Sequence, residues 1–153
     1  MEIKVEGKNK KNSDIVKDIY CGKFSDLTTF LFFKYSSYLY KNSDSYFSNN
    51  MSKISNDSLI HMDIFGRLIT MLGGIPNFNE YVNDEIYYVL EKDKLIEVSI
   101  RLVKEKIIKY TNALNIIKDR YIEEILKDFI IEERRNLEII ELLQLKYKHN
   151  HFN

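Results

Sequence analysis

Four long stretches of the chain repeat apolar residues at alternating spacings of three and four, which is the period of an amphipathic helix. They cover approximately residues 13–41, 44–72, 91–117 and 120–147. Among 153 residues there are one proline and five glycines, and so few turn-forming residues disfavour a fold of many strands. The sequence therefore predicts an all-α fold built from four long helices.

The segments between these helices predict how the helices are arranged. Residues 42–44 and 118–119 are tight reversals, so the helices on either side of each are expected to run antiparallel. Residues 73–90 begin with Gly-Gly-Ile-Pro, show no helical period and can cross the full length of a bundle. We expect an antiparallel four-helix bundle with one long crossover between the second and third helices. The aromatic residues of that crossover are expected to cover the bundle or to form a dimer surface: Phe78, Tyr81, Tyr87 and Tyr88.

Composition limits the domain organisation and the partners. We expect one bundle over residues 13–147, a flexible N-terminal tail at 1–12 and a C-terminal tail at 148–153. Lys plus Arg and Asp plus Glu both total 23, so net charge predicts neither nucleic-acid nor membrane binding. Cys21 is the only cysteine, and no apolar run reaches the roughly 18 residues of a membrane span, which leads us to expect a cytoplasmic location.

Polar residues occupy several positions where the helical spacing demands apolar ones. They lie near the middle of their helices, so in helices of matched length they are expected to meet at one level of the bundle. Burying a carboxylate there is costly unless it is paired, hydrogen-bonded or bound to metal. The polar positions are Asp26 and Thr29 on the first helix, Ser58 and His61 on the second, and Glu133 and Asn136 on the fourth; the third helix has Val103 at its centre.

Four segments resemble the ferritin-like superfamily, the group of bacterioferritin, rubrerythrin and manganese-catalase-related small bacterial proteins. The most specific is His61-Met-Asp-Ile-Phe to Leu-Gly-Gly-Ile-Pro76, which resembles a second-helix segment that begins Glu-x-x-His and ends Leu-Gly-Gly-x-Pro. The other three segments are Phe24–Thr29, Ser99–Tyr110 and Ile130–Leu137. The resemblance covers approximately residues 14–145 and implies a ferritin-like bundle.

In that family four carboxylates and two histidines hold two ions of iron or manganese. When the family's ligand positions are compared with this chain one by one, the resemblance implies that His61 and Glu133 are retained. It also implies that Asp26, a shorter carboxylate, stands where the family has a glutamate. The remaining three positions have lost their ligand: Ser58, Val103 and Asn136. Because a two-metal site needs its bridging carboxylates, we do not expect ferroxidase, catalase or peroxidase activity.

Two functions remain open. In the first, the protein is a non-catalytic structural or interaction protein that forms a homodimer and binds a further protein that is not identified. Its polar core is then a hydrogen-bond network with a protonated His61. That network would contain Asp26, Ser58, His61, Glu133 and Asn136. In the second, Asp26, His61 and Glu133 bind one Fe, Mn or Zn ion for metal handling or oxidative-stress defence.

Overall fold

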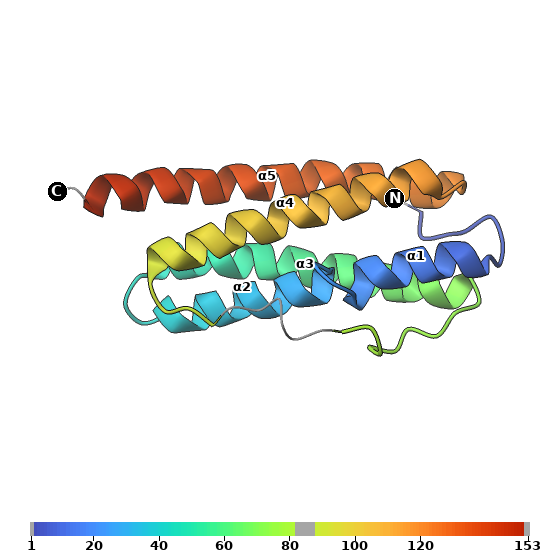
Figure 1. Ribbon diagram of the computed structural model, residues 1–153, viewed down its shortest axis with the longest axis horizontal. Coiled ribbons are helices and arrows are strands. Elements are labelled where there is room, and N and C mark those ends of the chain that lie inside the picture. The colour runs from blue at the N-terminus through green and yellow to red at the C-terminus, as the bar shows by residue number, and fades with distance from the viewer. Residues whose placement is uncertain (1, 82–87, 152–153) are drawn as a thin grey trace.

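The computed structural model describes residues 2–81 and 88–151, with side chains described up to Lys148. The described residues form five helices and no strand: α1 (Lys10–Cys21), α2 (Asp26–Tyr40), α3 (Ser45–Met71), α4 (Lys92–Ile116) and α5 (Arg120–His151). α1 and α2 follow one another along one side of the molecule, so the five helices build a bundle of four members (Figure 1). The predicted all-α bundle is confirmed. Among the described residues, no helix has the length and apolar character that a membrane span requires.

The long crossover connects the end of α3 to the start of α4 at the opposite end of the bundle, so α3 and α4 run parallel (Figure 1). Its described part lies against α1 and α2. Phe78 stacks on Tyr20 with ring centroids 5.1 Å apart, and Tyr88 meets Tyr35 edge to face at 4.9 Å. These two aromatic residues therefore cover the bundle, whereas Tyr87 lies outside the described residues.

The continuous first helix that we predicted over residues 13–41 is wrong, because the chain leaves the helix between Cys21 and Asp26. Gly22 is extended at φ −80° and ψ −159°, and Phe24 takes the left-handed conformation at φ 54°. Ser25 then caps α2 by accepting a hydrogen bond from the backbone N–H of Thr28 at 3.2 Å. As a result Asp26 stands in the first turn of a new helix.

The segments expected as tails differ from the prediction in their extent. α1 starts at Lys10 because the side-chain oxygen of Asn9 accepts a backbone hydrogen bond from its first turn. Before it, Ile3 and Val5 pack against the apolar core. At the other end α5 continues to His151, and residues 152–153 lie outside the described residues.

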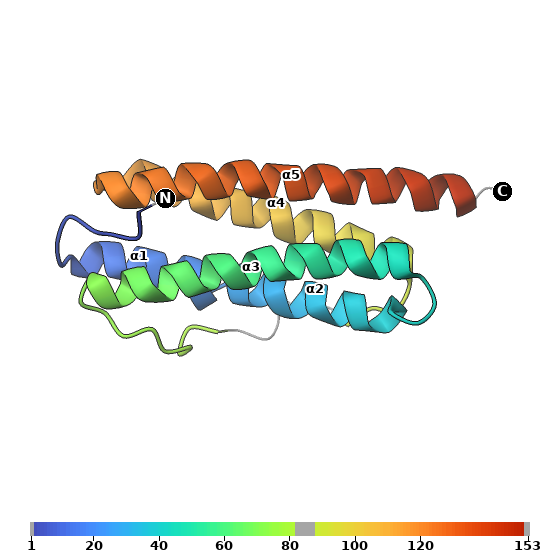
Figure 2. The same ribbon diagram turned by 180° about the vertical axis from the view of Figure 1, so that it is seen from behind.

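The apolar core consists of two clusters, one towards each end of the bundle. One includes Val16, Phe65 and Phe129, and the other includes Phe33 and Ile54. Viewed from behind, α3 and α5 run in opposite directions (Figure 2), and His61 near the middle of α3 meets Glu133 of α5 at one level of the bundle, with His61 Nδ1 3.4 Å from Glu133 Oε1. The polar residues at that level separate the two clusters, and they form the candidate site.

We predict that Gly22→Ala destabilises the protein by about 1–3 kcal/mol, because a Cβ at Gly22 would lie 2.7 Å from the backbone oxygen of Asp18. Gly7 is the matched control, since a Cβ there meets no atom within 4 Å, and Gly7→Ala is expected to change stability by less than about 0.5 kcal/mol. Urea unfolding of both variants measures the difference. Equal effects would contradict this account of the break between α1 and α2.

Candidate functional site

All four members of the bundle contribute a polar side chain to its centre. Asp26 comes from α2, His61 from α3, Lys106 from α4 and Glu133 from α5, and each is at most 1% exposed. The predicted meeting of Asp26, His61 and Glu133 therefore occurs in the structure. Lys106 was not predicted.

The ammonium group of Lys106 lies between the two buried carboxylates. Its Nζ is 2.8 Å from Oε1 of Glu133 and 3.1 Å from Oδ1 of Asp26. The hydroxyl oxygens of Thr29 and Ser58 are each 3.1 Å from the same Nζ, and they lie 3.0 Å from one another. Ser58 thus accepts a hydrogen bond from a lysine ammonium inside the bundle.

One sequence signal could have identified Lys106. Ser99, Val103, Lys106 and Tyr110 are spaced 4, 3 and 4, so Lys106 falls on the buried face of α4, and all four side chains are buried. The neighbouring Ile107 satisfies nearly the same spacing, and an apolar residue is the usual occupant of such a position.

His61 reaches three groups through one nitrogen and a fourth group through the other. Its Nδ1 is 3.2 Å from the Tyr110 hydroxyl, 3.4 Å from Oε1 of Glu133 and 3.7 Å from Oδ1 of Asp26. Its Nε2 forms a short hydrogen bond to the carboxylate of Glu132, a side chain that is 47% exposed. The His61 ring stacks on Phe129 with centroids 3.8 Å apart, which fixes its plane.

Tyr110 connects His61 to Asp26. Its hydroxyl lies 2.7 and 2.6 Å from the two carboxylate oxygens of Asp26, to which it donates. Burial and the nearby Asp26 carboxylate raise the pKa of Tyr110 well above its usual value, so the hydroxyl stays protonated and keeps this donor role.

The charges of the site balance without an added ion. Burial alone would raise the pKa of Asp26 and of Glu133, but Lys106 and His61 outweigh it and lower both pKa values. Burial alone would lower the pKa of Lys106, but the two carboxylates raise it. For His61, hydrogen bonds to Asp26, Glu132 and Glu133 outweigh burial and raise the pKa to about 10. Two negative and two positive buried groups therefore face one another at neutral pH.

The other two predicted positions lie apart from this cluster. Asn136 is buried, but its side chain accepts a hydrogen bond from Lys53 at 2.7 Å and donates one to Asp57 at 3.2 Å. The expectation that Asn136 joins the buried network is therefore not met, because it faces the Lys53–Asp57 ion pair on α3. Val103 packs in an apolar cluster and has no donor atom to offer.

The residues present fit a two-metal centre poorly and a single ion only in part. The ligand atoms of Asp26, His61 and Glu133 lie within 4.8 Å of one another, which is close enough for one metal ion. Oε2 of Glu133 is buried and has no hydrogen-bond partner among the described residues. The ammonium of Lys106, however, lies against both carboxylates, so a metal ion could bind them only if that group moved away.

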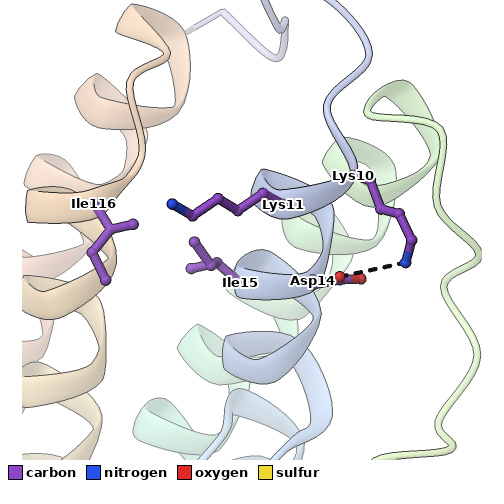
Figure 3. Close-up of a pocket in the computed structure, with 5 residues that line it drawn as sticks. All are labelled: Lys10, Lys11, Asp14, Ile15 and Ile116. Atoms are coloured by element: carbon purple, nitrogen blue, oxygen red, sulfur yellow. Dashed lines mark ion pairs between the residues drawn. The ribbon is translucent and has the colours of Figure 1, made fainter.

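One pocket of the described structure lies outside this cluster. It is a surface hollow of about 670 Å³ between α1 and the end of α4 (Figure 3). Lys10, Lys11, Asp14, Ile15 and Ile116 line it, and none of them belongs to the buried site. The chemistry-bearing residues of the core therefore do not open into this pocket.

We predict that Lys106→Met destabilises the protein by about 3–5 kcal/mol, because it leaves two buried carboxylates without their ammonium partner. Lys109 on the same helix serves as the control. Its Nζ pairs with Asp18 at 2.9 Å near the surface, so Lys109→Met is expected to change stability by at most about 1 kcal/mol. Guanidinium unfolding of both variants measures the effects. A similar small loss in both would contradict the importance of the buried ion pairs.

The raised pKa of His61 predicts that its contribution to stability is complete below pH 6.5 and is lost as the pH rises towards 10. Over that interval the folded state keeps a proton that the unfolded state has released, so stability falls by up to about 1.4 kcal/mol per pH unit. The difference in unfolding free energy between the natural protein and His61→Gln should therefore shrink with rising pH. A difference that is constant from pH 6 to 9.5 would show that His61 is not charged in the folded state.

The fold is similar to that of a solved structure, although comparison of the sequence with protein families and curated proteins finds no match. No family model matches the chain, and no curated protein matches it. Among solved structures it is similar to a bacterioferritin of Rhodobacter capsulatus, described with a metal-free dinuclear site and haem iron. The TM-score is 0.76 at 15% sequence identity, and the alignment covers 94% of this chain and 89% of that chain. The chain therefore has the ferritin-like four-helix-bundle fold.

Proposed function

We propose that this protein is a non-catalytic ferritin-like bundle that serves as a structural or interaction protein. The observation that carries the proposal is the ammonium of Lys106, which lies 2.8 and 3.1 Å from the two carboxylates that a metal ion would need. Redox chemistry at a two-metal centre requires carboxylates that bridge the ions and open positions for oxygen or peroxide. Here Lys106 and His61 are already paired with the two carboxylates of the core.

The residues at the remaining ligand positions support the same proposal. Ser58 bonds to Thr29 and Lys106, Val103 is apolar, and Asn136 is engaged by Lys53 and Asp57. None of these three side chains supplies a charged ligand. Ferroxidase, catalase and peroxidase activity are accordingly not part of the proposed function.

Association with a second copy of the chain is part of the proposal. α5 exposes Ile131, Leu142 and Leu145, which are 49%, 64% and 65% exposed. Spacings of 11 and 3 residues place them along one side of the helix. The exposed Arg135 and Glu138 lie between Ile131 and Leu142 on the same side, and a mixture of exposed apolar and charged side chains suits contact with another protein surface. We also propose a cytoplasmic location, with which the free, buried thiol of Cys21 is compatible.

Binding of a single divalent ion is the second candidate function. It is favoured by the convergence of Asp26, His61 and Glu133 and by the Oε2 atom of Glu133, for which the described residues provide no partner. An Fe, Mn or Zn ion held there would suit metal handling or oxidative-stress defence. It requires the Lys106 side chain to withdraw from the carboxylates.

Elemental analysis of protein purified without chelator or affinity tag separates the two candidates. We expect a metal content far below one ion per chain and no oxygen consumption on addition of Fe²⁺. The control is the Asp26→Asn/His61→Gln/Glu133→Gln variant, which keeps the side-chain volumes almost unchanged. One metal ion per chain in the natural protein, absent from this variant, would overturn the non-catalytic proposal in favour of the second candidate.

A further inference from the structure

We infer that the ammonium of Lys106 holds the place of a metal ion, so that removing it turns the core into a binding site for one divalent cation. The ligands of that site would be Asp26, His61 and Glu133. This inference rests on the proposed function and identifies the residue that keeps a divalent ion out of the natural protein.

The surroundings of Lys106 Nζ resemble the oxygen shell of a bound cation. Four oxygen atoms lie within 3.1 Å of it, two from carboxylates and two from hydroxyl groups. They come from α2, α3 and α5, while the lysine comes from α4. The ammonium is therefore the point at which all four members of the bundle meet. Carboxylate and hydroxyl oxygens together with an imidazole nitrogen are also a suitable ligand set for Mn²⁺, Fe²⁺ or Zn²⁺.

The ammonium and a metal ion cannot occupy this point together. A divalent ion bound to Oδ1 of Asp26 and Oε1 of Glu133 would lie about 2.0–2.2 Å from each oxygen. Lys106 Nζ contacts the same two oxygen atoms at 3.1 and 2.8 Å. Oδ1 of Asp26 also accepts a hydrogen bond from the Tyr110 hydroxyl at 2.7 Å, and Nδ1 of His61 lies 3.7 Å from Oδ1 of Asp26 and 3.4 Å from Oε1 of Glu133. The ammonium thus fills the place from which a metal ion would contact both carboxylate oxygens.

Truncation of Lys106 leaves both the space and the driving force for an ion. Lys106→Ala removes the ammonium and its stem from a fully buried position, while the carboxylates, the two hydroxyls and the imidazole stay in place. Two buried carboxylates then lack their closest cation, which is strongly unfavourable. Uptake of a divalent cation restores the missing charge at the same place, so binding and stability are coupled.

The test is calorimetric titration of the full-length chain with Zn²⁺ and, separately, Mn²⁺, with thermal unfolding measured alongside. We expect Lys106→Ala to bind one Zn²⁺ per chain at least about ten-fold more tightly than the natural protein does, and its Tm to rise on binding. The control is Asp26→Asn/Lys106→Ala/Glu133→Gln, which retains every surface group and is expected to lose this binding. Absence of Zn²⁺ and Mn²⁺ binding by Lys106→Ala, with the natural protein also metal-free, would overturn this inference and leave the proposed function intact.

Stoichiometric metal in the natural protein would instead overturn the proposed function, so the two failures are distinct. If Lys106→Ala folds only when Zn²⁺ is present, the inference is supported, because the ion then supplies the missing charge. If it folds under neither condition, Lys106→Gln replaces it in the same titration. Binding by Lys106→Gln that is lost in Asp26→Asn/Lys106→Gln/Glu133→Gln supports the inference, and no binding overturns it.

Discussion

The contact of the Lys106 ammonium with the carboxylates of Asp26 and Glu133 is the interaction on which the core depends. A buried carboxylate is costly without a partner, and these two lie close enough together to repel one another. Lys106 attracts both and also donates to the hydroxyls of Thr29 and Ser58. One side chain of α4 thereby bonds to each of the other three bundle members, which orients the helices about a single point.

His61 supplies the second positive charge of the core, and its ring also forms a hydrogen bond to a side chain at the surface. Tyr110 bridges His61 to Asp26, and the outer nitrogen of His61 is paired with the half-exposed Glu132. The lysine and the protonated histidine together carry the two positive charges that one divalent ion would carry. The ferritin-like bundle can therefore bury its two central carboxylates without an ion, because two side-chain cations replace it.

Much of this arrangement was predictable from residue spacing, and the exceptions have physical causes. Asp26, His61 and Glu133 meet as predicted, because a carboxylate or imidazole at an apolar helix position must find a polar partner inside. Lys106 was missed because a lysine is rarely buried and Ile107 beside it fits the apolar stripe. Asn136 was assigned to the same cluster, but the rotation of α5 turns it towards Lys53 and Asp57.

The sequence by itself determined the helices, the long crossover and the level at which polar residues enter the core, since these follow from local spacing and turn-forming residues. It did not reveal the break at Gly22–Ser25, where one left-handed residue and a serine cap interrupt an otherwise helical period. Only the tertiary structure decided which cation meets the two carboxylates. The reach of a lysine ammonium depends on the relative height and rotation of four helices, and no spacing within a single helix specifies these.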